Sequence, residues 1–381
     1  LRVGRSMRAP AVFARAFAVM LGITMLGGCR GNSRLAEGSA SDSLYVGVEQ
    51  SVQGTRGVFL ALEHLNARRP AGTRPFALKP PLGPGTTSVA TATAFRDDPR
   101  LIGVIGHQGS NQLLEAAPVY SDIAGHERRA VPVITPTGTN AQLTLVSRWI
   151  LRICPQDADN ARALAQFAID SLHARRVGVI YRNDVFGRGF LRGFESAFTT
   201  LGGQIIERDP HLAGVTDYAT YFQRMMGRRP DALVIAGGSS EYEPMLQALH
   251  TAGADMLPIL ASDDMASWVG DTIMLRDRRI TRYTSFYVTG NPISPAGERF
   301  EEDYLAKWGT VANHQAALAY DAATLLGEAV YAVGADRHRV RDWLASVGRT
   351  RPPFAGISGE IRFDENYNAV KKRIVIARIG Q

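Results

Sequence analysis

The chain has 381 residues, of which 45% are hydrophobic and 21% are charged. This composition is typical of a folded globular protein of two or three domains and excludes disorder throughout. The formal net charge is +7, but residues 1–28 contain four arginines and no acidic residue, so the rest of the chain is too weakly basic to indicate a nucleic-acid-binding protein.

The first 28 residues have the pattern of an export signal peptide. Arg5 and Arg8 give a positive start ahead of an apolar run over residues 16–26, which is about half the roughly 20 residues needed to cross a bilayer. The run ends in Leu-Gly-Gly before Cys29 and so resembles the lipobox of bacterial lipoproteins; an ordinary secretory signal that contains a cysteine is the alternative. We expect lipidation at Cys29 and a flexible, lipidated tether over residues 29–43. Cys154 then has no partner for an intrachain disulfide.

From residue 44 onward, apolar strands alternate with amphipathic helices. Strands are expected at residues 44–48, 76–78, 101–105, 131–134, 176–181, 204–207, 232–236 and 258–261. Helices are expected at residues 54–66, 86–95, 159–172, 189–201, 218–226, 243–252, 298–308, 315–333 and 341–347, with one more beginning at Ser110 or Asn111. Residues 359–364 and 371–379 are expected to form a closing hairpin or edge strands.

This alternation predicts parallel sheets that are covered by helices on both faces. Because it occurs in two runs, we expect an α/β fold of two doubly wound parallel-sheet lobes joined by a hinge with several crossings. The first lobe is expected to comprise residues 44–152 and 290–354, since the late helices return to it. The second lobe is expected to comprise residues 153–289 and 355–381.

The segment 101–122 combines a buried strand, a glycine-rich turn and a capped helix. The cap is expected at Ser110 or Asn111. The first helical N–H groups have no partner within the helix and lie at the positive end of its dipole, so a carboxylate or phosphate is the natural ligand. Three residues follow the next strand and reach the same edge of the sheet: Thr137, Gly138 and Thr139. The structural alternative is that these side chains only cap a helix and a turn.

The strand ends of the second lobe carry acids. Asp263 and Asp264 follow one strand and Glu241 follows another, and these carboxylates suit a cation. A ligand held between the two lobes would therefore carry both charges, as the head of an amino acid does. Four or five charged hydrogen bonds of about 1.5–3 kcal/mol each, with side-chain burial, can reach the roughly 8 kcal/mol of micromolar binding. The alternative is that both aspartates cap the helix that follows.

Motifs for catalysis, metals and cofactors are missing from the sequence. Gly103, Gly106 and Gly109 have the spacing G-x-x-G-x-x-G and not that of a dinucleotide site. There is no Walker loop, the serines after Gly238 lack the glycine of a nucleophile elbow, and the eight histidines are dispersed. Cys154 has no obvious histidine partner and is expected to be a packed or exposed bystander. We therefore expect no enzyme, no metal and no cofactor.

The chain resembles a known family, the type I periplasmic solute-binding proteins. The resemblance is to the branch that binds leucine, isoleucine, valine and related amino acids for ABC importers. The segments that carry it are residues 46–48, 104–110, 132–139, 176–181, 186–187, 230–238, 319–322, 356–359 and 363–364. They occur in the expected order and span nearly all of residues 44–381.

The resemblance implies a role for individual residues. The positions that hold the ligand α-carboxylate in the family correspond to Ser110, Thr137 and Thr139. The acidic position that takes the α-ammonium corresponds to Asp263, with Asp264 as the register alternative.

Two departures from the family concern the side-chain pocket. Phe186 matches an aromatic residue that lines this pocket, but Gly238 and Ser239 stand where another aromatic residue is usual, and the loop between residues 50 and 57 lacks an expected tyrosine. The pocket is therefore expected to be wider, and the substrate need not be branched-chain.

The resemblance implies a lipid-anchored, monomeric substrate-binding protein in the periplasm or cell envelope. It would capture a small amino acid in the cleft between its lobes and deliver it to an ABC permease in the membrane. The alternatives are a ligand-sensing envelope protein of the same fold, and a binder of an amide, urea or an aromatic acid.

Overall fold

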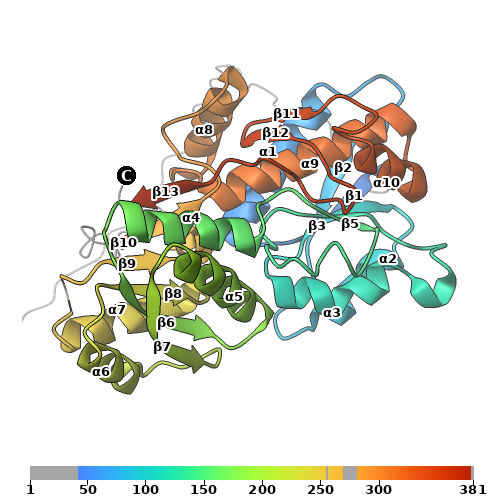
Figure 1. Cartoon of the computed structure of the whole chain (residues 1–381). Helices are drawn as coiled ribbons and strands as arrows, with labels where there is room; N and C mark the ends of the chain where they lie inside the picture. Colours follow the sequence, from blue (N-terminus) through green and yellow to red (C-terminus); the bar gives the residue numbers. More distant parts are fainter. Residues whose placement is uncertain (1–41, 255, 269–280, 379–381) are drawn as a thin grey trace, which may run out of the picture. The chain divides into compact units, whose positions relative to one another are not determined.

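Two β-sheets organise the molecule, which is seen here in a computed structural model that describes residues 42–254, 256–268 and 281–378 (Figure 1). The expected signal peptide, Cys29 and most of the expected tether lie outside the described residues. The predicted α/β fold of two parallel-sheet lobes is confirmed.

The first sheet has five strands in the order β2-β1-β3-β4-β5, and every neighbouring pair is parallel. The strands are β1 (Leu44–Glu49), β2 (Phe76–Lys79), β3 (Leu101–Gly106), β4 (Val133–Thr135) and β5 (Ile150–Arg152). Its helices are α1 (Val52–Ala67), α2 (Ser88–Arg96), α3 (Ser110–Tyr120) and α9 (His314–Val333). Successive side chains of a strand point to opposite faces, so Ile134 packs with α1 and α9, while Val133 packs with α2 and α3.

Helix α9 is the central helix of this lobe and lies beside α1 (Figure 1). Among the described residues it is the one helix that is long and apolar enough to cross a membrane, but 67% of that stretch is buried inside the protein. Its apolar character therefore reflects its place in the core. Helices α8 (Pro295–Trp308) and α10 (Arg337–Ala345) contribute Tyr304 and Leu344 to the same core.

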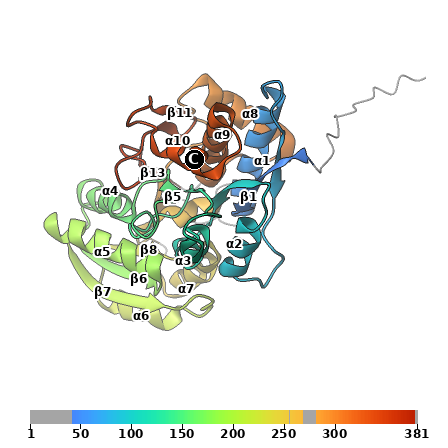
Figure 2. The same cartoon turned by 90° about the vertical axis from the view of Figure 1, so that its right-hand side faces the viewer.

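The second sheet has the strand order β13-β10-β9-β8-β6-β7 and is parallel except for β13. The strands are β6 (Arg176–Arg182), β7 (Gln204–His211), β8 (Ala232–Ala236), β9 (Ile259–Ala261), β10 (Thr281–Ser285) and β13 (Val375–Arg378). Helices α4 (Asp157–Asp170) and α5 (Val185–Thr200) cover one face, and α6 (Ala219–Gly227) and α7 (Tyr242–Thr251) cover the other (Figure 2). On β8, Val234 packs toward the first pair and Leu233 toward the second.

The structure differs from the sequence prediction in a few short strands. Strands β5 and β10 were not predicted. For residues 359–364 and 371–379, the hairpin alternative was wrong, because β12 (Gly359–Ile361) pairs back with β11 (Phe354–Gly356). The edge-strand alternative is confirmed for β13, which is antiparallel to β10 at the edge of the second sheet.

The expected boundary at residue 355 also differs from the structure. Ile357, Ile361 and Phe363 pack in the core of the first lobe, and only β13 joins the second sheet. The chain therefore passes from one sheet to the other after β5, after β10 and before β13 in the described part of the chain.

Replacing Gly57 by Ala is expected to destabilise the first lobe by about 1–3 kcal/mol or more. A Cβ atom at this position of α1 would lie 2.1 Å from the carbonyl oxygen of Ala316 on α9, so the two helices would have to move apart. Urea denaturation of the purified protein measures the effect. Gly227→Ala at the end of α6 is the matched control, because nothing lies within 4 Å of its Cβ position. Equal stability of the two variants would contradict the tight crossing of α1 and α9.

Candidate functional site

Helix α3 begins at Ser110, and its N-cap is Gly109. The prediction that Ser110 or Asn111 is the cap was wrong, because Gly109 takes the extended cap conformation and the helix starts one residue earlier. The cap residue Gly109 has no side chain that could accept from the first turn, which leaves the first N–H groups of the helix as donors for an anion. The Ser110 side chain is buried, and its hydroxyl accepts a hydrogen bond of 3.3 Å from the backbone N–H of Asn140.

The loop after β4 lies against the turn before α3. The Thr137 hydroxyl donates to the backbone carbonyl of Gln108 at 2.7 Å, and the N–H of Gly138 donates to the Thr135 hydroxyl at 2.9 Å. Thr139 is fully buried, and its hydroxyl faces the Asp157 carboxylate. The structure thus brings the expected residues of the first lobe together at one edge of its sheet.

This loop is held by a buried arginine that was not predicted. Arg152, the last residue of β5, donates through Nη1 to the carbonyl oxygens of Thr139 at 3.1 Å and Asn140 at 2.5 Å. Its Nη2 donates to the Asn368 side chain. Burial lowers the pKa of Arg152. A charged residue at the end of an apolar run is the signal in the sequence that could have indicated it.

The first turn of α4 connects this loop to Asp263. Asp263 is buried and accepts a hydrogen bond of 2.9 Å from Nδ2 of Asn160, whose Oδ1 has no partner among the described residues. One turn earlier, the N–H of Asp157 donates to the carbonyl of Thr139 at 2.9 Å. Burial raises the pKa of Asp157 to about 6. Burial, with the neighbouring Asp264 and Asp157 carboxylates, raises the pKa of Asp263.

Two asparagines of the first lobe reach the start of α5 in the second. Asn111 donates through Nδ2 to Asp184 at 2.7 Å and accepts from the N–H of Val185 at 3.0 Å. Asn140 donates through Nδ2 to the carbonyl of Val185 at 3.0 Å. The strand ends of the two lobes are therefore in direct contact in this structure.

A group of charged side chains, not predicted as a whole, lies at the carboxyl ends of β6, β7 and β8. Arg182 pairs with Asp184 at 2.5 Å and approaches Glu241 at 3.9 Å, and His211 approaches Glu241 at 3.8 Å. Asp264 is partly buried, and burial raises its pKa to about 7, although Arg182 lowers it. Position at a strand end, which selected Asp263 and Asp264, would also have selected Arg182, which follows the predicted strand 176–181. It would not have selected His211, because the predicted strand 204–207 ends four residues earlier than β7.

The remaining predicted site residues lie in the second lobe. Phe186 is buried at the start of α5, with its ring centroid 6.4 Å from that of Phe190. Ser239 begins the short 3-10 turn Ser239–Glu241, and its side chain lies outside the described part. In the first lobe, Cys154 is buried in the core, and burial raises its pKa.

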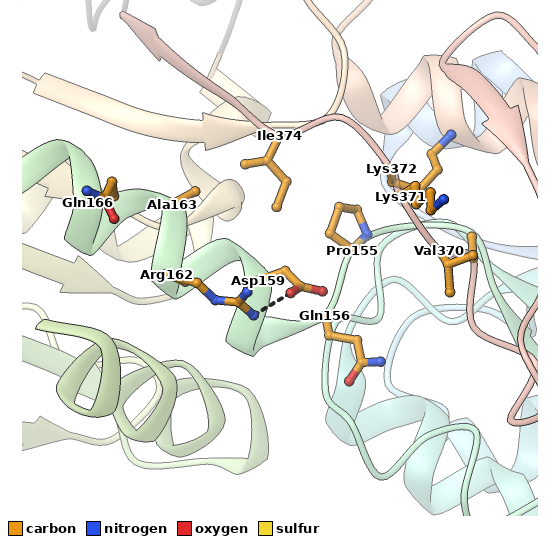
Figure 3. A pocket seen from close by; sticks show the side chains of 11 residues that line it. Pro155, Gln156, Asp159, Arg162, Ala163, Gln166, Val370, Lys371, Lys372 and Ile374 are labelled. Carbon is orange, nitrogen blue, oxygen red and sulfur yellow. Dashed lines mark hydrogen bonds and ion pairs between the residues drawn. The ribbon is translucent and has the colours of Figure 1, made fainter. Parts of the chain in front are cut away.

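A groove of about 450 Å³ lies between α4 and the C-terminal segment (Figure 3). It is lined by the outward side of the first turns of α4, including Gln156, Asp159 and Arg162, and by Lys371 and Ile374. None of the predicted site residues lines it. This groove is therefore separate from the inward-facing Asp157 and Asn160.

The model of the periplasmic binding protein family matches residues 51–381. The chain belongs to this family. The predicted resemblance is thus confirmed, and a periplasmic binding protein is expected to close two lobes on a ligand at the strand ends described above.

Relatives of this periplasmic binding protein are distant. An "Amino acid binding protein" of Pseudomonas aeruginosa is 25% identical over 167 residues, which are 44% of this chain and 43% of that one. A "Leu/Ile/Val-binding protein" of Escherichia coli K12 is 24% identical over 151 residues, which are 39% of this chain and 40% of that one. The matched segment thus spans less than half the length of these curated relatives.

Solved structures share the fold over a larger part of the chain. A branched-chain amino acid transporter substrate binding protein of Streptococcus pneumoniae, in complex with isoleucine, has a TM-score of 0.76 at 21% identity and covers 88% of this chain and 99% of its own. A solute binding protein of Rhodopseudomonas palustris, in complex with 3,4-dihydroxy benzoic acid, has a TM-score of 0.74 at 18% identity and covers 88% of this chain and 93% of its own.

Proposed function

We propose that this periplasmic binding protein captures a small amino acid between its lobes and delivers it to an ABC permease, without catalysing a reaction. The observation that supports this most is the series of contacts from Ser110 through Asn140, Asp157 and Asn160 to Asp263. It connects an uncapped helix N-terminus in one lobe to a buried carboxylate in the other. An amino acid has an α-carboxylate that suits the helix N-terminus and an α-ammonium that suits the buried carboxylate.

The α-carboxylate would be bound by the first N–H groups of α3, with Ser110, Thr137, Gly138 and Thr139 around it. The Thr139 hydroxyl is fully buried and faces the Asp157 carboxylate, so it belongs to the same series of contacts. A carboxylate gains from both the free donors and the helix dipole.

The α-ammonium would be bound by Asp263, which Asn160 positions from α4. Burial of a carboxylate without a cation is costly, and the raised pKa of Asp263 reflects that cost. A bound ammonium would remove it. The ligand would thus stabilise the closed arrangement by its greater affinity for that state.

Isothermal titration calorimetry of the purified protein with a panel of amino acids tests this function. We expect at least one amino acid to bind with micromolar affinity or better, and a decarboxylated or deaminated analogue of it to bind much more weakly. Aromatic acids belong in the panel because a structural neighbour was solved with 3,4-dihydroxy benzoic acid. Tighter binding of an acid without an ammonium group would contradict the proposed role of Asp263. If an amino acid binds but no gene for a partner permease exists, a ligand-sensing protein of the same fold is favoured over a transport protein.

The membrane anchor is a separate part of the proposal. The thiol of Cys29 would be lipidated, as the lipobox-like sequence before it indicates. Cys29→Ser is expected to move the protein from the membrane fraction to the soluble envelope fraction, and cell fractionation measures this. Cys154→Ala is the control and is expected to stay in the membrane fraction. A Cys29→Ser protein that also remains there would refute the anchor.

A further inference from the structure

The charged group at the strand ends of the second lobe lies next to the proposed ligand site. Asp184 accepts hydrogen bonds from Arg182 of β6 and from Asn111 of α3, which is the neighbour of Ser110. The Arg182 charge also acts on Asp264, which is the neighbour of Asp263. Arg182 therefore lies near both the proposed carboxylate site and the proposed ammonium site.

Arg182 occupies the space that opens at Gly238. A Cβ atom at residue 238 would lie 2.2 Å from Nη1 of Arg182. The wider pocket expected from the missing aromatic residue is therefore partly filled by a guanidinium group. Its Nε donates to Asp184, and Nη1 and Nη2 are further donors of the same guanidinium group.

Glu241 is the acceptor that faces this donor. Its side chain is 3% exposed, and its Oε2 accepts a hydrogen bond of 2.8 Å from the N–H of Gly238. Its Oε1 is 3.9 Å from Nη1 of Arg182, which is too far for a direct hydrogen bond. A ligand group that carries both a hydrogen-bond acceptor and a hydrogen-bond donor would therefore bind to Arg182 and to Glu241 at the same time.

His211 lies beside Glu241 and completes this buried group. Its Nδ1 faces the carbonyl oxygen of Leu212 at 3.1 Å and the hydroxyl of Tyr218 at 3.4 Å. Its Nε2 is fully buried and faces Oε2 of Glu241 at 3.8 Å. His211 therefore lies on the side of Glu241 that already accepts from Gly238, and Oε1 is the oxygen that faces Arg182.

We propose that the site selects an amino acid with a carboxamide side chain, such as glutamine or asparagine, and disfavours branched aliphatic ones. The amide oxygen would accept from Arg182, and the amide nitrogen would donate to Glu241. An aliphatic side chain would desolvate both groups without replacing their hydrogen bonds, and sites built to hydrogen-bond a substrate reject such analogues strongly. This inference rests on the proposed function, because it assumes that the amino-acid head binds at Ser110 and Asp263.

Calorimetry of the purified protein with glutamine, asparagine, leucine, glutamate and lysine tests the inference. We expect glutamine or asparagine to bind at least about tenfold more tightly than the other three. If leucine binds as tightly as the amides, or if glutamate or lysine binds more tightly, the carboxamide inference is overturned and the proposed function stands. If no amino acid binds, both are overturned.

Variants then identify the groups responsible. Arg182→Met and Glu241→Gln are each expected to weaken amide binding at least tenfold and so to reduce the preference for the amide over leucine. Gly238→Ala is expected to act like Arg182→Met, because it displaces the guanidinium. Arg208→Met, which removes an exposed partner of Glu195 on β7, is the control and should change neither. Thermal melts verify that each variant is folded. Amide binding that survives both Glu241→Gln and Arg182→Met would overturn the assignment.

Discussion

Asp263→Asn is expected to remove most ligand binding and to leave the ligand-free protein at least as stable as the wild type. Loss of one partner from a buried charge pair costs about 2–5 kcal/mol, which is a loss of about 30-fold or more in affinity. The ligand-free protein carries no such pair. In it, Asp263 is a buried carboxylate whose pKa burial raises, and Asn keeps an oxygen that can accept from Nδ2 of Asn160.

The pH dependence of this effect has a defined sign. An acid whose pKa is higher in the folded than in the unfolded protein makes folding less favourable as the pH rises above the unfolded value of about 3.9. The melting temperature of Asp263→Asn should therefore match that of the wild type below about pH 4 and exceed it at neutral pH. Calorimetric melts without ligand at several pH values measure this difference.

The matched control for Asp263→Asn is Asp159→Asn. Asp159 lies on the outward side of α4, where it is exposed and pairs with Arg162. Its substitution should alter neither ligand affinity nor stability by more than about 0.5 kcal/mol. Unchanged ligand affinity in Asp263→Asn would show that the ammonium is bound elsewhere, and a lower melting temperature at neutral pH would contradict the cost of burying the carboxylate.

The fold was predictable because its signals are local. Residues 232–236 form an apolar run whose side chains are buried on both faces of the sheet, and β8 has these same bounds. Strand β5 was missed because three residues show no periodicity, and its identity depends on pairing with β4. The position of residues 357–363 in the first lobe likewise depends on packing against distant residues, which no local pattern encodes.

The candidate site was predictable where a residue lies in the loop or turn that follows a predicted strand. Ser110, Thr139 and Asp263 were found in this way, and the structure connects them through α4. The N-terminal turn of α4 itself was missed, because Asp157 and Asn160 resemble solvent-exposed helix residues in the sequence. Their burial arises only when the loop of Thr139 packs against that turn.

Arg152→Met is expected to lower stability by about 2–4 kcal/mol and to weaken ligand binding as well. Arg152 is fully buried, and hydrogen bonds from a charged group contribute about 1.5–3 kcal/mol each. Its Nη1 is shared by the carbonyls of Thr139 and Asn140, and the side chain also donates to Asn368. Part of this loss of stability is offset because the substitution also removes the desolvation cost of the buried charge. The expected loss is therefore smaller than the summed contributions of the three hydrogen bonds.

Unlike an ordinary core residue, Arg152 is expected to affect ligand affinity as well as stability. It connects the loop that would hold the ligand carboxylate to Asn368, which lies in the last crossing between the sheets before β13. Urea denaturation measures the stability, and calorimetry at a temperature where the variant is fully folded measures the affinity. Arg148→Met is the control, because Arg148 is 51% exposed and pairs with Glu127 at the surface, where such pairs contribute under about 1 kcal/mol. A folded Arg152→Met protein with wild-type affinity would show that the Thr139 loop keeps its shape without the arginine, and its position would then have to come from the hydrogen bonds of Thr137 and Ser110 alone.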